Sequence, residues 1–350
     1  MERQESNIDP KTEQKGMRWE EYEPMFRPRG VHMGVMKCDA ELCTHCGLCV
    51  ENCPFKAWEM DDNKIPGLKK DYACFSCYNC MVACPTGAIT IVKPYHVEKG
   101  SFYKTLDDPL EFEMPAEPLD KKGNPDTWTE VERTILERRS VRNFKPDPVS
   151  DHLIRRVLEA GRFAPSSGNC QPWKFIVITD RHLIHQINKT CYPLFNMLYT
   201  VYTDDHAVKN LVPAYVEDPK PGSYDPRLVL GGIGSIAKKD ASIFPDAPVV
   251  ILIACDERSI GGPQIQAGIC GQNMNLAAKS LGLGFCWIGF SQAIEKIPEL
   301  KRKLGLEDPW KITTAAVLGY PNFKQEGMVP REKRPVTWFR KAEEGPVVER

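Results

Sequence analysis

Two runs of cysteines with identical spacing constrain this sequence more than any other feature. Residues 43–54 read CTHCGLCVENCP and residues 74–85 read CFSCYNCMVACP. Both follow the pattern C-x-x-C-x-x-C-x-x-x-C-P, in which three thiolates come from one short loop and a fourth points to a neighbouring site. Structural zinc sites use separated C-x-x-C pairs or cysteine–histidine mixtures, and disulfide scaffolds are typical of short secreted chains. The spacing therefore indicates two [4Fe-4S] clusters.

The same spacing assigns the ligands of the two clusters, because the fourth cysteine of each run ligates the cluster held by the other run. The first cluster is expected on Cys43, Cys46, Cys49 and Cys84, and the second on Cys74, Cys77, Cys80 and Cys53. The pattern is that of a bacterial two-cluster ferredoxin. It predicts a small ferredoxin-like bicluster domain that transfers single electrons.

The overall composition excludes several classes of function. The 350 residues carry 46 Lys and Arg against 47 Asp and Glu, a net charge of −1, which argues against nucleic-acid and membrane-surface partners. No apolar run approaches the roughly 18 residues of a membrane span. The cysteines outside the two runs are scattered, and the chain opens with a polar segment, so we expect a cytoplasmic protein.

Changes in composition along the chain predict four regions. They are an N-terminal extension over 1–37, the cluster domain over 38–95, a linker rich in proline and acidic residues over 96–127, and a second domain over 128–345. Thr127 and Glu130 have capping-box spacing where a helix of the second domain is expected to start. Amphipathic helical segments then alternate with apolar runs such as APVVILIACD and ITTAAVLGYP, which are typical of strands buried on both faces. The expected fold class is α+β.

Three polar segments of the second domain are candidates for binding a redox cofactor. RRSVRNF (138–144) and PREKRPV (330–336) carry arginines suited to a phosphate or carboxylate, and APSSGNCQPW (164–173) places small polar residues before a strand. Taken singly, each is equally typical of a charged surface, an ordinary helix-to-strand turn or a charged tail. A fourth segment, GGIGSIA (231–237), is similar to a dinucleotide-binding fingerprint. However, Pro245 leaves too few residues for the helix that such a site requires.

Together with LGLGFCWIGF (281–290) and LGYP (318–321), these segments resemble, in this order, the nitroreductase family of FMN flavoproteins. The resemblance covers about residues 128–340. It implies a nitroreductase-like mixed sheet with surrounding helices, FMN as cofactor, and a homodimer with the flavin in the subunit interface. Residues 196–245 do not align with the family pattern, and we expect a lid or insertion there.

The resemblance also implies which residues hold the flavin. Its phosphate and ribityl chain would be bound by Arg138, Arg139, Ser140 and Arg142, with Arg331, Lys333 and Arg334 closing on the phosphate. The ring would lie near Pro165, Ser166, Ser167, Asn169 and Gln171, with the backbone N–H groups of Ile288 and Gly289 at its reactive edge. No catalytic acid–base residue is identified by the sequence.

The expected function combines both domains. The clusters would pass single electrons to FMN, which would reduce an electron-poor small-molecule substrate such as a nitroaromatic, quinone or enone. Reduced ferredoxin and NAD(P)H are alternative electron donors. Two further alternatives stay open: an electron relay or redox sensor without substrate turnover, and reductive dehalogenation or flavin-consuming chemistry.

Overall fold

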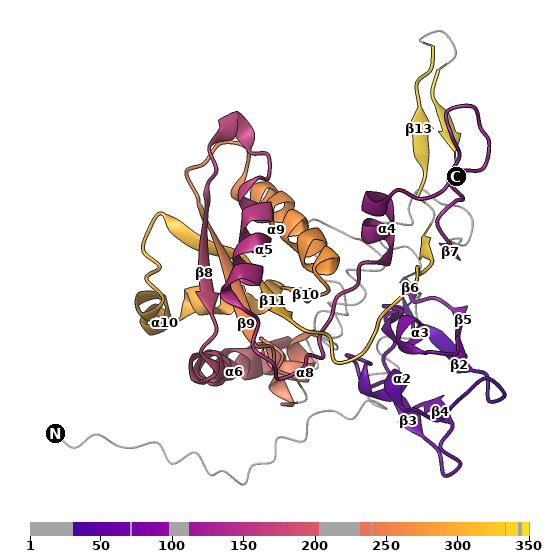
Figure 1. The fold of residues 1–350 in the computed structure, drawn as a ribbon. Coiled ribbons are helices and arrows are strands. Elements are labelled where there is room, and N and C mark those ends of the chain that lie inside the picture. Colours follow the sequence, from indigo (N-terminus) through magenta and orange to yellow (C-terminus); the bar gives the residue numbers. More distant parts are fainter. Residues whose placement is uncertain are drawn as a thin grey trace.

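The computed structural model describes residues 31–70, 72–97, 112–202, 232–239, 241–332, 334–341 and 345–349. These residues form a small cluster module, residues 31–97, beside a larger layered domain (Figure 1). None of the helices in this part of the chain is long and apolar enough to cross a bilayer.

A four-stranded sheet forms the centre of the larger domain. Its strand order is β10–β11–β9–β8, and every neighbouring pair is antiparallel. The strands are β8 (Trp173–Ile178), β9 (Val249–Asp256), β10 (Gly284–Ile288) and β11 (Trp310–Gly319). The two central strands, β9 and β11, are the apolar runs predicted to be buried. In β9 every residue except the last is buried, and in β11 the second half of the strand is buried. A parallel bridge between Ser140 and Phe285 at the edge of β10 makes the sheet mixed.

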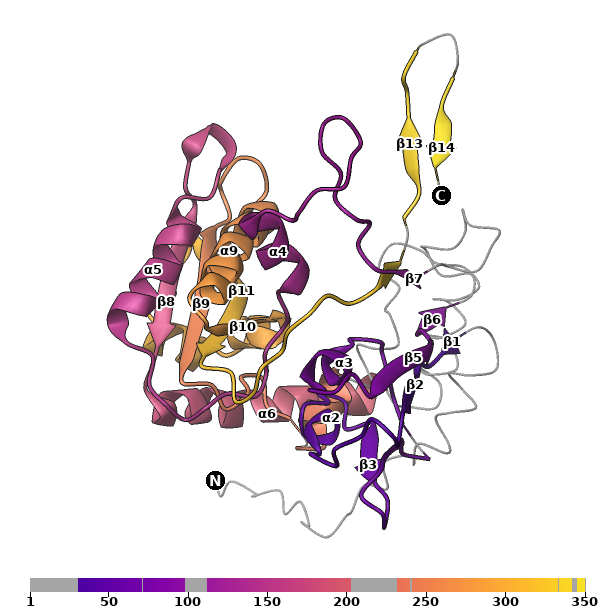
Figure 2. The same ribbon diagram turned by 45° about the vertical axis from the view of Figure 1, so that its right-hand side comes forward.

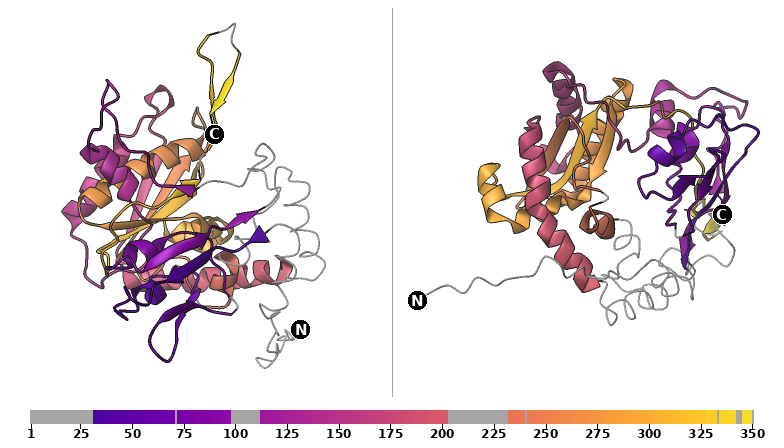
Figure 3. Two further views of the ribbon diagram at one scale, coloured as in Figure 1. Left: turned by 90° about the vertical axis from the view of Figure 1, so that its right-hand side faces the viewer. Right: turned by 90° about the horizontal axis from the view of Figure 1, so that it is seen from below.

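Helices cover both faces of this sheet. Helices α5 (Asp151–Arg162) and α9 (Pro263–Ser280) pack on one face, while α6 (Arg181–Tyr202) and α8 (Gly234–Ala237) lie on the other (Figures 1 and 3). The apolar stripe of each helix is buried against the sheet, which is the main stabilising contribution in a layered domain. α5 approaches α9 closely because Gly161 has no side chain: a Cβ there would lie 2.7 Å from Met274 Cγ.

The helix α4 (Glu130–Glu137) leads into the arginine segment. Its capping box uses Thr129 and Glu132, so the prediction of Thr127 and Glu130 was wrong by two residues. Thr129 Oγ1 accepts a hydrogen bond from the Glu132 N–H at 3.3 Å, and the Thr129 N–H donates to Glu132 Oε2 at 2.8 Å. Both threonines have a glutamate three residues later, so the sequence pattern alone fits either position.

The remaining elements follow β10 in the sequence, apart from one strand in the predicted linker. After β10 come the 3-10 helix η3 (Gly289–Lys296) and the helix α10 (Pro298–Lys303). β7 (Phe112–Glu113), inside the predicted linker, pairs with β12 (Arg331–Glu332). β13 (Val336–Trp338) and β14 (Val347–Glu349) form a hairpin that projects from the body (Figure 2). The chain after β11 therefore runs from the sheet towards the cluster module.

The cluster module is built from three small antiparallel pairs and two short helices. β1 (Val31–His32) pairs with β6 (His96–Val97), β2 (Val35–Cys38) with β5 (Ile89–Lys93), and β3 (Trp58–Met60) with β4 (Pro66–Leu68). The helices are α2 (Leu48–Glu51) and α3 (Asn79–Ala83). Within the described residues, β1 and β2 pair with strands of this module although they begin ahead of the boundary predicted at residue 38.

Part of the predicted organisation lies outside the described residues. This applies to 1–30 of the extension and to 203–231 and 240 within the stretch predicted as a lid or insertion. The described remainder of that stretch contains the end of α6 and the helix α8. α8 is only four residues long, so the GGIGSIA segment lacks the helix of a dinucleotide-binding crossover.

Candidate functional site: a cysteine-rich module beside an arginine cluster

The two cysteine runs fold into loops that repeat each other's backbone conformation. His45 and Ser76, two residues after the first cysteine of each run, have φ angles of 58° and 52°. Gly47 and Tyr78, two residues further on, have φ angles of 74° and 60°. Left-handed conformations are unfavourable for most non-glycine residues and persist where the surrounding structure requires them. Here they occur at the same two positions of both loops, so the two loops turn in the same way.

Backbone N–H groups point at several of these sulfur atoms. Ala57 N donates to Cys53 Sγ at 3.3 Å, and at the equivalent position Ala88 N donates to Cys84 Sγ at 3.3 Å. His45 N donates to Cys43 Sγ at 3.4 Å. Such donors stabilise thiolates and tune iron–sulfur clusters. The donor type and these hydrogen bonds therefore fit iron–sulfur ligation, although no three such side chains of the described residues are gathered closely enough to hold a metal ion.

The fourth cysteine of each run lies with the other run. Burial, together with the neighbouring Cys46 and Cys84, raises the pKa of the Cys49 thiol to about 11. Burial likewise raises the pKa of the Cys74 thiol to about 12, with contributions from Cys77 and Cys53. Cys84 thus acts on Cys49 of the first run, and Cys53 acts on the first three cysteines of the second run; the ligand sets expected from the spacing stay predictions.

A further thiol lies beside the first group. Cys38, at the end of β2, interacts with Cys43, Cys49 and Cys84. Burial and the Cys43 thiol raise its pKa to about 12. Its position before the first run is the only sequence signal for this placement.

The arginine segment that follows α4 lies along the edge of β10. Val141 N donates to Phe285 O at 3.0 Å, next to the parallel bridge between Ser140 and Phe285. Burial raises the pKa of the Cys286 thiol, whereas Arg142, Ser140 and Arg138 lower it. Three of the predicted flavin-binding side chains are therefore close to one sulfur atom of β10.

Positive charge accumulates in this segment. Burial and the neighbouring Arg331 lower the pKa of Arg138. Burial, Arg331 and Arg138 lower the pKa of Arg139 to about 10, and Glu137 counteracts part of this shift. The Nε of Arg139 is also buried without a hydrogen-bond partner among the described residues. Mutually repelling guanidinium groups with an orphaned donor fit an anionic group such as a phosphate.

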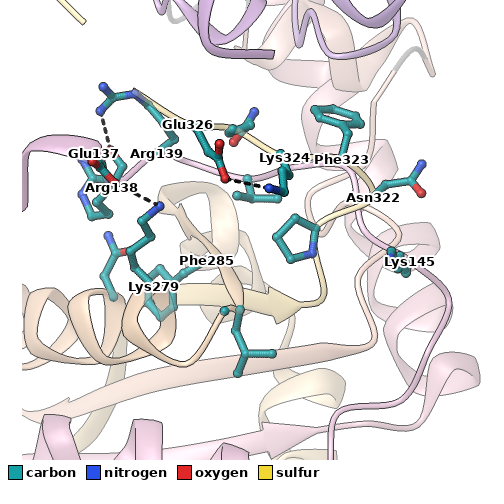
Figure 4. Close-up of a pocket in the computed structure, with 16 residues that line it drawn as sticks. Glu137, Arg138, Arg139, Lys145, Lys279, Phe285, Asn322, Phe323, Lys324 and Glu326 are labelled. Carbon is teal, nitrogen blue, oxygen red and sulfur yellow. Dashed lines mark hydrogen bonds and ion pairs between the residues drawn. The ribbon is translucent and has the colours of Figure 1, made fainter. Parts of the chain in front are cut away.

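A cavity of about 490 Å³ opens beside these arginines (Figure 4). Its lining includes Arg138, Arg139, Phe285 and two amides that the sequence did not single out, Asn275 and Gln325. Both amides are buried, and Asn275 Nδ2 and both polar atoms of Gln325 have no partner in the described structure. The amides come from α9 and from the segment after β11, so no local motif identifies them.

Ion pairs between Lys279 and Glu137 (3.9 Å) and between Lys324 and Glu326 (3.2 Å) lie at this cavity. They neutralise two of its lysines and leave Arg138, Arg139 and Lys145 as its other positive groups. The cavity covers only the arginine end of the predicted flavin site, since its lining contains none of Ser140, Arg142, Ile288, Gly289 and Arg331.

The predicted turn at Pro165–Gln171 lies elsewhere on the sheet. The turn precedes Trp173 of β8, which pairs with Cys255 of β9. The arginine segment lies beside Phe285 of β10, which pairs with Leu318 of β11. Leu318 pairs in turn with Val249 of β9. Six residues of β9 separate these levels, which is roughly 20 Å along a strand. One chain therefore does not bring the turn and the arginine segment together.

The remaining predicted residues have the following positions. In the turn, Gln171 N donates to Ser166 Oγ at 3.0 Å and Gln171 Nε2 donates to Asn169 Oδ1 at 3.2 Å, while Pro165 and Ser167 are exposed. Ile288 is buried at the end of β10 and Gly289 follows it, exposed. Arg334 is exposed, and Lys333 lies outside the described residues.

The cluster module docks on the arginine segment. Asn143 Nδ2 donates to Glu51 Oε1 at 3.0 Å, and Glu326 N donates to Val82 O at 3.3 Å. Val329 is buried in the hydrophobic core of the cluster module. Burial raises the pKa of the Cys77 thiol, and the nearby Arg142 counteracts part of that shift. Arg142 is therefore close to a thiol of the second loop and also to Cys286 of β10.

Comparisons with known proteins agree with this division of the chain. The sequence model described as the nitroreductase family matches residues 135–320, and that of a 4Fe-4S dicluster domain matches residues 42–89. A nitrobenzene nitroreductase of Ectopseudomonas oleovorans is 29% identical over 208 residues, covering 54% of this chain and 86% of the relative. A chloronitrobenzene nitroreductase of Comamonas testosteroni is 26% identical over 208 residues, with coverages of 54% and 86%. The structure of an FMN-bound nitroreductase of Desulfitobacterium hafniense DCB-2 shares 25% identity with a TM-score of 0.43, covering 59% of this chain and 96% of that one.

Proposed function

Because this chain belongs to the nitroreductase family, we propose that it is an iron–sulfur flavoprotein oxidoreductase that reduces electron-poor organic molecules. Two [4Fe-4S] clusters in the cluster module would deliver single electrons to FMN bound at the arginine segment. FMN, when bound, supplies the conversion of single electrons into two-electron reduction of an organic acceptor. Nitroaromatics are the first substrate class to test, because two of the similar proteins are named for nitrobenzene and chloronitrobenzene.

The observation that carries this proposal is the position of Arg142, which acts on the pKa of thiols in both the second cysteine loop and β10. Arg142 lies near Cys77 of that loop and near Cys286 of β10. In this proposal an electron leaving the second loop would pass Arg142 to reach the segment proposed to bind the flavin. A cluster module with an unrelated role would not need its ligand loop at this interface.

The residues of the chain have distinct roles in this proposal. Arg138, Arg139 and Arg331 would neutralise the flavin phosphate, which relieves their mutual repulsion. The backbone N–H groups on Cys43, Cys53 and Cys84 would stabilise the thiolates that ligate iron. Fixed positive and dipolar groups of this kind hold charged cofactors without reorganisation during electron transfer.

We propose that the active form is a homodimer. The Pro165–Gln171 turn and the arginine segment are separated by roughly 20 Å along the strands of one chain. A second copy would supply the turn to the flavin held by the arginines of the first copy. Size-exclusion chromatography with light scattering tests this, and a flavin-loaded monomer would contradict it.

The cofactor proposal is tested by composition and by one matched pair of variants. The purified protein should contain about eight iron atoms and one FMN per chain. The Arg138→Ala variant should weaken FMN retention about tenfold or more, because a charged hydrogen-bond partner of the phosphate is lost. Arg155→Ala, on the exposed side of α5, removes the same charge away from the site and should retain FMN like the parent protein. Protein without flavin, or equal retention in both variants, contradicts the assignment.

The electron donor is identified by anaerobic reductive titration followed by visible and EPR spectroscopy. One titration uses NADH or NADPH and the other uses reduced ferredoxin, each with nitrobenzene as acceptor. If ferredoxin alone reduces the flavin, the clusters lie on the input side. If nicotinamide reduces the flavin before the clusters, electrons leave through the cluster module. A reduced flavin that no nitroaromatic reoxidises would contradict the substrate class.

A further inference from the structure

The two cysteine loops are equivalent in sequence spacing and backbone conformation, but their environments differ. In the first loop Thr44, His45 and Cys46 are all exposed, and Leu42 just before it is 51% exposed. At the equivalent positions of the second loop, Phe75 is buried and Ser76 and Cys77 are half-buried. A repeat that differs only in exposure indicates different roles for its two halves.

The second loop is covered from several sides. Phe75 makes edge-to-face contacts with Phe55 and Tyr95, with ring centroids 4.7 and 5.5 Å apart. Gly34 lies against Cys74 and Ser76, and Gly34 N donates to Cys74 O at 2.9 Å. The larger domain adds the contact of Glu326 with Val82 in the helix that follows this loop. Among the described residues, the second loop is therefore less accessible to a protein partner than the first loop.

The first loop presents a different surface to solvent. The hairpin between β3 and β4 is tied to it by a hydrogen bond between His45 Nδ1 and Lys64 O at 3.1 Å. Exposed carboxylates flank the loop in this hairpin and before Cys43: Asp39, Glu41, Glu59, Asp61 and Asp62. Within residues 39–46 and 59–65 the one lysine is Lys64, and the exposed Lys37, Lys56 and Lys70 lie just outside these two ranges. We call these five carboxylates the acidic rim, and the exposed Leu42 and Cys46 lie among them in the sequence.

We infer that the first loop is the docking port for a one-electron carrier protein with a basic face around its redox centre, and that the second loop relays the electron towards the arginine segment. This inference rests on the proposed function and adds the order of the two clusters and the kind of partner. Charge complementarity between an acidic rim and a basic face orients the encounter and raises its rate. The exposed Leu42 supplies a small apolar contact within that surface.

The electron balance of the step is simple. One electron moves from the reduced carrier to the first-loop cluster, so the carrier is oxidised, the cluster is reduced, and no covalent bond forms or breaks. Two such encounters supply the pair of electrons that a two-electron reduction consumes. The port works in either direction, so an oxidised basic carrier can be used to probe it.

Cytochrome c, a basic protein with lysines around its haem edge, is a suitable probe. The dithionite-reduced holoprotein is mixed anaerobically with oxidised cytochrome c, and the second-order rate is measured at several salt concentrations. The variant Glu41→Lys/Asp62→Lys should react at least tenfold more slowly at low salt and lose the salt dependence. The control Asp147→Lys/Glu299→Lys makes the same change in net charge on exposed residues of the larger domain. It should change the rate less than twofold.

Equal rates for the two double variants would overturn the docking port. Iron content, flavin content and cluster reduction by dithionite are measured first on the same samples. If the clusters or the flavin are absent, the proposed function itself has failed. If they are present and reducible, a charge reversal without effect contradicts only the port.

The order of the clusters has an independent readout. Cys46→Ser and Cys77→Ser change equivalent proposed ligands of the two loops. Each variant alters the EPR signal of one cluster and so identifies which signal belongs to which loop. A soluble dysprosium chelate should enhance the relaxation of the signal marked by Cys46→Ser and have much less effect on the other. Equal effects on both signals, or a stronger effect on the signal marked by Cys77→Ser, would overturn the assigned order.

Discussion

Replacing Gly34 by alanine should damage the second cluster site selectively. A Cβ at this position would lie 2.5 Å from Ser76 Oγ, 3.1 Å from Cys74 Sγ and 3.3 Å from Cys74 O. The Ser76 hydroxyl cannot move away freely, because its oxygen accepts a hydrogen bond from Tyr95 N at 2.7 Å. The Cys74 carbonyl is backbone and accepts from Gly34 N itself. The added methyl group therefore pushes on a cluster ligand.

Overpacking of this kind costs about 1–3 kcal/mol, and about 2 kcal/mol corresponds to roughly a 30-fold change in the unfolding equilibrium. The matched control is Gly67→Ala in β4 of the same module, where the new Cβ has no atom within 4 Å. That variant should be as stable as the parent or gain up to about 1 kcal/mol, since alanine restricts the unfolded chain.

The assay is anaerobic denaturant unfolding together with iron content and EPR of the reduced protein. We expect Gly34→Ala to lose stability and to alter the signal that Cys77→Ser also alters, while Gly67→Ala leaves both signals intact. If Gly34→Ala is as stable as Gly67→Ala and keeps an unchanged second-loop signal, the close approach of Gly34 to Cys74 is not what shapes this site.

Two further predictions concern the larger domain. Thr129→Ala should lower the free energy of unfolding by about 1 kcal/mol because the capping box is lost, whereas Thr127→Ala should have little effect. Equal losses of stability in the two variants would contradict Thr129 as the cap residue. Hydrogen bonds from Thr129 lower the pKa of Glu132 below its usual 4.5, so the cap stabilises above that pH and the difference between Thr129→Ala and the parent should shrink as the pH falls through the lowered value. In α9, the new methyl group of Gly271→Ala would overlap the Trp287 ring and should lower the free energy of unfolding in urea by about 1–3 kcal/mol. Gly268→Ala, whose new Cβ has no atom within 4 Å, should raise that free energy by up to about 1 kcal/mol. If Gly271→Ala proves the more stable variant, the packing argument is refuted.

The sequence determined the local chemistry of the cluster module. The spacing of each cysteine run fixes which thiols share a loop, and in the fold Cys84 acts on Cys49 and Cys53 acts on Cys74. The apolar runs of β9 and β11 likewise predicted their burial, because a strand without a polar face is stable only when both faces are covered.

Other features could not be predicted from local patterns. Thr127 and Thr129 satisfy the same capping pattern, and the structure uses only the latter. The amides of Asn275 and Gln325 meet at the arginine cavity from segments far apart in the chain, so no spacing rule reveals them. Their convergence depends on how α9 and the chain after β11 pack around β10.

The contrast between the two cysteine loops shows most clearly what the sequence determines and what the tertiary structure decides. Ligand type and loop conformation were set by the sequence, since they depend on a dozen consecutive residues and on short-range sterics. The exposure of the first loop and the burial of the second were decided by the tertiary structure. They depend on the packing of Gly34, Phe55 and Tyr95 around the second loop, and on the contact of Glu326 with Val82, which joins residues more than two hundred positions apart. Burial is a property of surfaces that meet only after folding, and a repeated motif carries no record of which copy will be covered.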